Sequence, residues 1–238
     1  MKRFTLYIIL AVLSINSVCF GETITFGTFP IPKMVLDENH GNFIELTRAI
    51  SERAGIDIEI VVKPTKRTIQ NFKLNETDVL FPALDVNFSP ENQPIKSGEL
   101  LYVKRDYIFT RKGDPLLRSI KELECKKVGI TLGYPYARKL TGNSLIEFDM
   151  AHCDEINVLK LTNKRFDAFV VEETTGLKAF QDKGASDEVQ YDPDSPISEM
   201  DVYYAFQNTK KGKWLAEVVT IVLSEMKQDG TFSEIIDK

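Results

Sequence analysis

Two adjacent carboxylates mark the first place where this sequence could hold a charged solute. Glu172 and Glu173 follow an apolar run, Phe166–Val171, that is typical of a buried strand, and they precede a helical pattern near Thr174–Asp182. A carboxylate at the end of such a strand suits an ammonium group, and acidic residues are also favoured in the first turn of a helix. One of the two could therefore contact a ligand ammonium while the other caps the helix.

A glycine turn after the short strand pattern Lys127–Thr131 is the second candidate. Gly133 leads into a helical pattern near Pro135–Leu140, and the free N–H groups at the start of a helix could bind an anion. Gly133 also simply permits a tight turn between strand and helix. Tyr134 and Tyr136 flank this turn, where they could stack on a ligand or only cover the protein surface.

Several kinds of chemistry lack the residues that they need. His40 and His152 are the only histidines, they lie far apart, and no Cys-x-x-Cys pair is present, so no metal site is predicted. Neither a Gly-x-Ser-x-Gly turn nor a nucleophile–base pair is recognisable. The net charge of −5 argues against nucleic acid and anionic membranes as partners. The sequence predicts a non-enzymatic protein that needs no cofactor and binds a small molecule.

Residues 1–21 have the order of a secretory signal peptide. Lys2 and Arg3 precede the apolar run Leu6–Val12, and small polar residues follow as far as Gly21, after which we expect cleavage and export to the periplasm. Cys19 is a poor lipidation site because Asn16-Ser17-Val18 precede it. No later run approaches the length of about 18 apolar residues that a membrane span needs.

Cys125 and Cys153 remain after this cleavage, and the sequence leaves their pairing open. An exported protein can form such a disulfide. Cys125 precedes one predicted strand and Cys153 follows the next, which places the two at opposite ends of a parallel pair and strains the geometry of a bridge.

The remaining chain alternates between strand and helix patterns. Helical spacing is clearest at Phe43–Ile50 and at Trp214–Met226. Strands are predicted at Thr23–Gly27, Ile56–Val62, Val79–Phe81, Leu100–Thr110, Lys127–Thr131, Leu145–Phe148, Phe166–Val171, near Val189, and at Val202–Phe206. This alternation indicates an α/β protein with largely parallel sheets, which bind ligands beyond the carboxyl ends of their strands. Two such halves that face each other would form a cleft.

In the order of these residues the chain resembles bacterial extracellular solute-binding proteins, family 3, which serve polar amino acid uptake. The resemblance spans nearly the whole chain after residue 21 as a pattern match, without one unmistakable motif. It rests on five segments: Gly41–Ile50, Leu74–Val79, Lys127–Gly133, Asn163–Glu172 and Met226–Ile236.

This resemblance implies a two-lobe periplasmic binding protein-like fold of type II. Residues 22–110 plus 197–238 would form the first lobe and residues 111–196 an inserted second lobe, with two hinge strands between them. The implied function is capture of a polar solute by hinge closure, as a monomer, for delivery to the permease of an ABC transporter. A sensor subunit that presents its closed form to a membrane receptor is the alternative. Dehydratases of the same fold make an enzyme a more distant third.

The resemblance also assigns residues to the ligand. Relatives hold the ligand carboxylate with an arginine at the position of Asn92, so an ordinary carboxylate clamp is missing here. Asp85 falls in a turn near the cleft, where it would repel a carboxylate. Phe29 matches an aromatic residue over the solute, although a core role fits it almost as well. Glu172 matches the acid that pairs with the ligand ammonium, so we predict that Glu172 contacts the ligand and that Glu173 caps the helix.

Two arginines could replace the missing clamp. Arg67 follows Pro64 at the start of a predicted helix, and Arg111 lies at the implied hinge. Most arginines on helices are solvated surface residues, which is the other interpretation of Arg67. Acidic candidates outnumber the cations that can be assigned, so we predict a ligand with at least one ammonium group.

Overall fold

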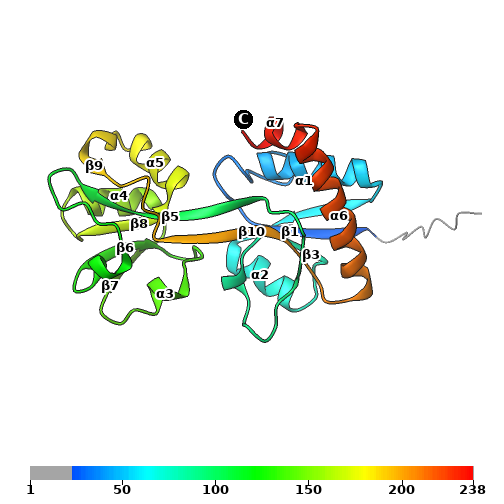
Figure 1. Cartoon of the computed structure of the whole chain (residues 1–238), viewed down its shortest axis with the longest axis horizontal. Coiled ribbons are helices and arrows are strands. Elements are labelled where there is room, and N and C mark those ends of the chain that lie inside the picture. The colour runs from blue at the N-terminus through cyan, green and yellow to red at the C-terminus, as the bar shows by residue number, and fades with distance from the viewer. Residues whose placement is uncertain (1–22, 238) are drawn as a thin grey trace, which may run out of the picture.

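The computed structural model describes residues 23–237 of the chain. The predicted signal peptide, residues 1–21, and the lipidation site considered at Cys19 lie outside the described residues. Two α/β lobes are joined by two long strands that run side by side from one lobe to the other (Figure 1). In residues 23–237 no helix combines the length and the apolar character that a membrane crossing requires.

The first lobe contains both ends of the described chain. Its strands are β1 (Ile24–Thr28), β2 (Ile58–Val62), β3 (Val79–Ala83) and the short β4 (Ile95–Lys96), and its helices are α1 (Asn42–Ala54), α2 (Thr65–Lys73), α6 (Lys210–Gln228) and α7 (Thr231–Ile236). Strand β1 pairs in parallel with β2 and β3. Helix α1 buries Phe43, Leu46 and Ile50 at helical spacing and ends at Gly55, whose φ of 63° a glycine adopts without strain.

The second lobe is built from the middle of the chain. Its strands are β6 (Lys127–Thr131), β7 (Glu147–Ala151), β8 (Ala168–Glu172) and β9 (Val189–Gln190), and its helices are α3 (Arg138–Thr141), α4 (Asp154–Thr162) and α5 (Glu173–Asp182). Strand β6 pairs in parallel with both β7 and β8. Short 3-10 turns occupy Asp85–Asn87 in the first lobe and Ile120–Leu123 and Ser186–Glu188 in the second. Cys125 and Cys153 are free thiols in this structure.

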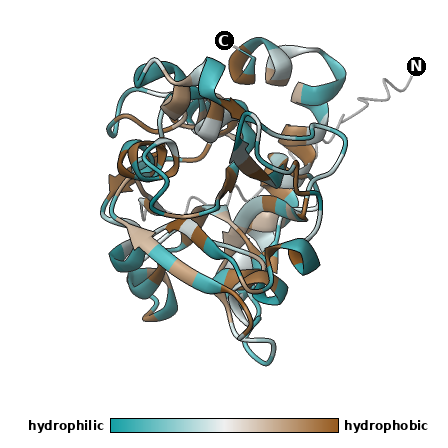
Figure 2. Ribbon diagram, turned by 90° about the vertical axis from the view of Figure 1, so that its left-hand side faces the viewer, coloured by the Kyte–Doolittle hydropathy of each residue, from teal (hydrophilic) through white to brown (hydrophobic). Residues whose placement is uncertain are grey.

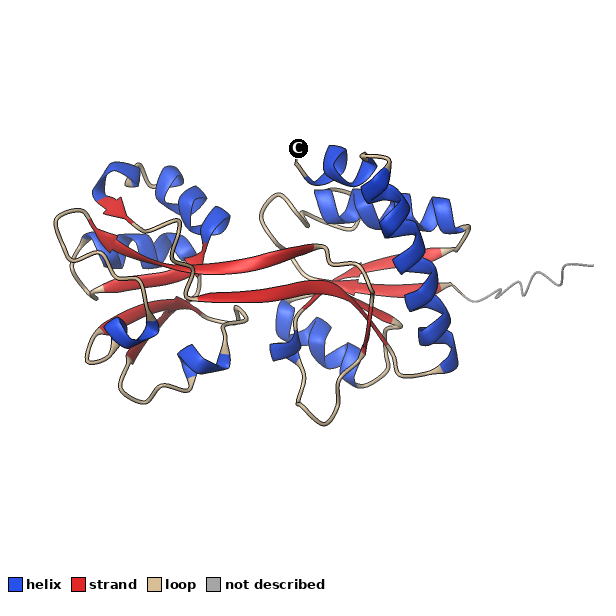
Figure 3. Ribbon diagram, in the orientation of Figure 1, coloured by secondary structure: helices blue, strands red, loops and turns tan. Residues whose placement is uncertain are grey.

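Strands β5 (Tyr102–Arg111) and β10 (Ser198–Phe206) belong to both lobes (Figure 3). They pair with each other through Tyr102–Asp106 and Ser198–Val202. Beyond that stretch β10 pairs with β3, and β5 pairs with β8. The strand order β2-β1-β3-β10-β5-β8-β6-β7 therefore runs through both lobes in one curled sheet. The fold is the predicted type II arrangement with two crossing strands.

Each lobe packs around its own apolar residues. Phe26, Leu46 and Tyr204 belong to the core of the first lobe, and Phe109 and Phe180 to a core of the second. Hydrophobic segments lie on many of the strands, whereas the outer loops and helix turns are mostly hydrophilic (Figure 2). Tyr107 and Phe109 pack in the second lobe because β5 spans both lobes. The boundaries 110/111 and 196/197 stay a prediction.

Candidate functional site

A cavity lies between the two lobes, at the ends of strands from both. The first lobe lines it with the segment after β1, the start of α2 and the end of β3, and the second lobe with the turn after β6 and the β8–α5 junction. Its lining residues are Phe29, Pro30, Ile31, Pro32, Thr65, Pro82, Leu84, Tyr102, Lys104, Gly133, Tyr134, Pro135, Glu172 and Thr175. The cavity volume of about 90 Å³ is far below the roughly 300–1,000 Å³ of drug-sized sites, so it suits a small solute.

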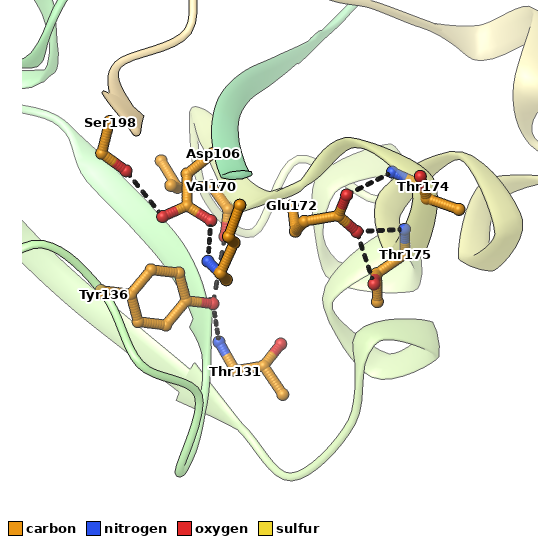
Figure 4. Close-up of polar contacts among 9 residues, drawn as sticks. Asp106, Thr131, Tyr136, Val170, Glu172, Thr174, Thr175 and Ser198 are labelled. Carbon is orange, nitrogen blue, oxygen red and sulfur yellow. Dashed lines mark hydrogen bonds and ion pairs between the residues drawn. The ribbon is translucent and has the colours of Figure 1, made fainter. Parts of the chain in front are cut away.

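Glu172 lines this cavity and also caps helix α5. One carboxylate oxygen, Oε1, accepts a hydrogen bond from the backbone N–H of Thr174 at 3.1 Å. The other, Oε2, accepts from the N–H and the hydroxyl of Thr175, both at 2.8 Å (Figure 4). These bonds use the orphan N–H groups of the first turn and fix the side chain beside the cavity.

The prediction that Glu173 caps the helix is wrong. Glu173 does not cap α5, because the helix begins at Glu173 itself and the residue before it takes the cap position. Its carboxylate instead accepts a hydrogen bond from the hydroxyl of Tyr191 at 2.8 Å. The prediction placed the helix start one residue too late.

Polar side chains form a row across three neighbouring strands behind the cavity. Asp106 on β5 lies directly opposite Ser198 on β10 and directly opposite Glu172 on β8. The Ser198 hydroxyl donates to Asp106 at 2.7 Å. Both carboxylates of the row are therefore cross-strand neighbours, an arrangement that is unfavourable unless each has its own partner. Glu172 has the helix N-terminus, and Asp106 has a cation.

That cation is Lys104, two residues before Asp106 on the same face of β5. The two form a buried ion pair, with 8% of the lysine side chain and none of the aspartate side chain exposed. The ammonium group also lies 5.5 Å from the centre of the Tyr136 ring. Lys104 lines the cavity, as does Tyr102. Burial and the nearby negative charges of Glu172 and Asp106 raise the pKa of Tyr102 well above its ordinary value.

Two tyrosines near the glycine turn have separate surroundings. Tyr134 lines the cavity, and its hydroxyl donates to Asp154 at 2.8 Å. Burial, together with the charge of Asp154, raises the pKa of this phenol. Tyr136 lies deeper, where its hydroxyl accepts from the N–H of Thr131 at 2.9 Å and donates to the carbonyl of Val170 at 3.2 Å (Figure 4).

The anion site predicted at Gly133 does not form. Gly133 has a φ of 90° and lines the cavity as part of a turn. Helix α3 begins only at Arg138 and has four residues, because Ala137 is still extended with a ψ of 135°. No helix start therefore directs its N–H groups toward a ligand from Gly133.

Tyr136 does not line the cavity, and neither do the other four predicted residues. Arg67 and Asn92 are exposed and lie outside its lining. Asp85 accepts from the Tyr203 hydroxyl at 2.6 Å and pairs with Lys96, with 62% of its side chain exposed. Arg111 turns into the second lobe, where it donates to the carbonyls of Leu161 and Phe166 at 2.9 and 2.7 Å and pairs with Asp114.

These positions correct the clamp hypothesis. Arg111 is committed to backbone carbonyls because the end of β5 lies inside the second lobe rather than at the cleft. Lys104 is the buried cation that the sequence argument missed. Its only signal was the charged stretch Lys104–Asp106 inside an apolar strand, with Lys104 and Asp106 at the alternation that places them on one face.

A second, more open depression adjoins the cavity and shares Gly133, Tyr134 and Pro135 with it. Its edge carries a direct contact between the lobes. The guanidinium of Arg138, at the start of α3, donates to the carbonyl of Phe88 in the first lobe at 2.6 Å. This bond crosses the cleft and holds the lobes together.

The fold and this cavity define a two-lobe solute-binding protein. The sequence matches bacterial extracellular solute-binding proteins, family 3, over residues 25–238, and the chain belongs to that family. Its resemblance to the family is thereby confirmed.

Individual similarities are weaker. The arginine-binding extracellular protein ArtP of Bacillus subtilis (strain 168) is 24% identical over 202 residues, which cover 82% of this chain and 75% of that protein. The GluR0 ligand-binding core from Nostoc punctiforme, solved with L-glutamate, has a TM-score of 0.72 at 23% identity, covering 90% of this chain and 97% of that chain. A histidine kinase sensor domain has a TM-score of 0.70 at 18% identity, covering 90% and 93%.

Proposed function

We propose that this protein captures a small, ammonium-bearing, amino acid-like solute in the periplasm and delivers it to the permease of an ABC transporter. The observation that carries the proposal is Glu172, a carboxylate fixed at the wall of an inter-lobe cavity by the first turn of α5. An ammonium group suits this position because it supplies both a charge and hydrogen-bond donors. The amino acid-binding names of ArtP and of the glutamate-bound relative agree with such a guest.

Hinge closure would seal the solute between the lobes, and the protein is expected to act as a monomer. Strands β5 and β10 are the only strands that serve both lobes among the described residues, so bending there changes the width of the cleft. The closed state would contain the contacts between the lobes that this structure has, including the bond from Arg138 to the Phe88 carbonyl.

A thermal-shift screen of amino acids, amines and small acids tests this proposal. A bound solute at 100 times its Kd stabilises the folded state by about 2.7 kcal/mol, which gives a readily visible rise in melting temperature. We expect the shifts among ammonium-bearing solutes. Tight binding only to acidic, amine-free solutes would contradict the proposal.

A sensor function is the second candidate, because a histidine kinase sensor domain has the same fold. The residues inside the cavity do not separate the two functions. Deletion of the protein does: loss of solute uptake supports transport, whereas an altered signalling output with normal uptake supports sensing. A dehydratase-like activity would instead appear as turnover of a cyclic acid that Glu172→Gln abolishes.

A further inference from the structure

The charges that line the cavity balance each other. Among its lining residues, Lys104 and Glu172 are the two that carry a formal charge, one of each sign. Lys104 lies on β5 two residues before Asp106, which is directly opposite Glu172 on β8. Lys104 and Glu172 are therefore diagonal neighbours on one face of the sheet, and such positions lie about 7–8 Å apart at the backbone. A small solute with two opposite charges fits between them.

We propose that Lys104 binds the carboxylate of a zwitterionic amino acid whose ammonium group is held by Glu172. The proposal rests on the ammonium-binding function of Glu172 and adds a second charged contact, made by a residue of the hinge strand. It moves the carboxylate contact from the wall of the first lobe to the hinge strand, which agrees with Asn92 and Arg67 lying outside the cavity.

The hydrogen bonding of Lys104 leaves room for this contact. An ammonium group has three donors, and the structure commits one of them to Asp106. Tyr136 offers the cation the face of its ring rather than an acceptor atom. The second carboxylate oxygen of Asp106 already accepts a hydrogen bond from the Ser198 hydroxyl. Asp106 therefore has its own partners and positions the lysine whether or not a ligand is bound.

A purely structural role for Lys104 makes a different prediction. If the lysine only neutralises Asp106, its removal destabilises the fold without discriminating between ligands. If it binds a carboxylate, its removal selectively weakens ligands that have one. The two roles are separated by comparing an amino acid with its decarboxylated amine on the same variant.

The experiment uses isothermal titration calorimetry with the tightest-binding L-amino acid of the screen and its matching amine, such as L-valine and isobutylamine. Lys104→Met is compared with the double variant Lys104→Met/Asp106→Asn, which leaves no uncompensated buried charge and keeps the test valid if the single variant unfolds. Arg105→Met is the matched control, because Arg105 is an exposed cation next in the chain that pairs with Glu199 at 2.7 Å on the opposite face.

We expect the wild-type protein to prefer the amino acid over the amine by about 10- to 100-fold, the value of one charged hydrogen-bonded contact. Both Lys104 variants should lose this preference because amino acid binding weakens while amine binding stays the same or tightens. Arg105→Met should keep it. A preference that survives in the double variant would overturn the role of Lys104, as would equal wild-type affinity for both compounds. Neither result touches Glu172, whereas failure of all amines and amino acids to bind would refute the proposed function itself.

Discussion

The two walls of the cavity differ in chemistry. The first lobe contributes Phe29, Pro30, Ile31, Pro32, Pro82 and Leu84, with Thr65 as its one polar side chain in the lining. The hinge strand and the second lobe contribute both formal charges, together with Thr175 and the two tyrosines Tyr102 and Tyr134. The apolar wall has no side chain with a formal charge.

This difference suggests a division of labour during capture. In the proposed capture, the charged wall would hold the polar ends of the solute, and the apolar wall would exclude water as it closes over them. Excluding water strengthens the charged contacts, because electrostatic interactions grow as the local dielectric falls. Both formal charges of the lining therefore lie on the hinge strand and the second lobe.

The largest expected effect comes from removing the anion of the charged wall. Glu172→Gln keeps one oxygen, which can still accept from the N–H and hydroxyl of Thr175, but it loses the bond that Oε1 accepts from Thr174 and cannot form an ion pair with an ammonium. Affinity for amino acids should therefore fall about 100-fold, while the loss of one capping bond should lower the melting temperature only slightly. Calorimetry measures the affinity. Glu173→Gln is the control, because Glu173 bonds Tyr191 and does not line the cavity. Equal losses in both variants would remove Glu172 from the site.

A smaller and less selective effect is expected from the apolar wall. Phe29→Leu keeps a buried apolar side chain and removes the aromatic face, so every ligand should weaken by about 10-fold or less. The ratio of amino acid to amine affinity should not change, because this wall carries no charge. A changed ratio in the titrations would show that the two walls do not act separately.

The contact that joins the two lobes beside the cavity should have a weaker effect still. Arg138→Met removes the bond to the Phe88 carbonyl, which is worth about 1 kcal/mol or about fivefold in the closure equilibrium. Affinity should fall by at most that factor, because only a ligand-free protein that is mostly open transmits the whole change in the closure equilibrium to binding. To the extent that the ligand-free protein is closed, small-angle scattering should instead show a larger radius of gyration for the variant. Lys139→Met, the adjacent exposed cation, should change neither quantity.

The sequence was sufficient for the fold and for one side of the site. Alternating strand and helix patterns predicted the α/β class, and the apolar run before Glu172 placed that carboxylate at a strand end. These are local signals: apolar spacing and the position of a charge after a strand. The glycine turn placed Gly133 and Tyr134 at the cavity, and the resemblance to the family placed Phe29 there.

The rest depended on contacts between distant segments. Lys104 and Asp106 share a face by alternation, but the sequence does not tell that Ser198, 92 residues from Asp106, and Glu172 lie beside them on neighbouring strands. Arg111 has the charge that a carboxylate clamp needs, but its guanidinium donates to the carbonyls of Leu161 and Phe166, which lie 50 and 55 residues away in the sequence. Asp85 is likewise occupied by Lys96 and Tyr203.

The smallest expected effect comes from a residue far from both walls. It tests whether the changes in ligand affinity of the cavity variants arise only from a loss of folding stability. Asp229, just before α7, accepts from the N–H and hydroxyl of Thr231 and pairs with Arg53 at 2.6 Å, and these contacts lower its pKa from 3.8 to about 2. A carboxyl whose folded pKa is depressed stabilises the fold above its unfolded pKa and loses that contribution as the pH falls toward the folded value.

Asp229→Asn should therefore lower the melting temperature slightly at pH 7, and the difference from the wild-type protein should shrink between pH 4 and pH 2, the window set by about 3.8 and about 2. Ligand affinity and the amino acid to amine ratio at pH 7 should stay unchanged, because α7 lies outside the cavity lining. If the modest loss of stability in Asp229→Asn changed the ratio of amino acid affinity to amine affinity, the affinity changes of the cavity variants could not be assigned to either wall.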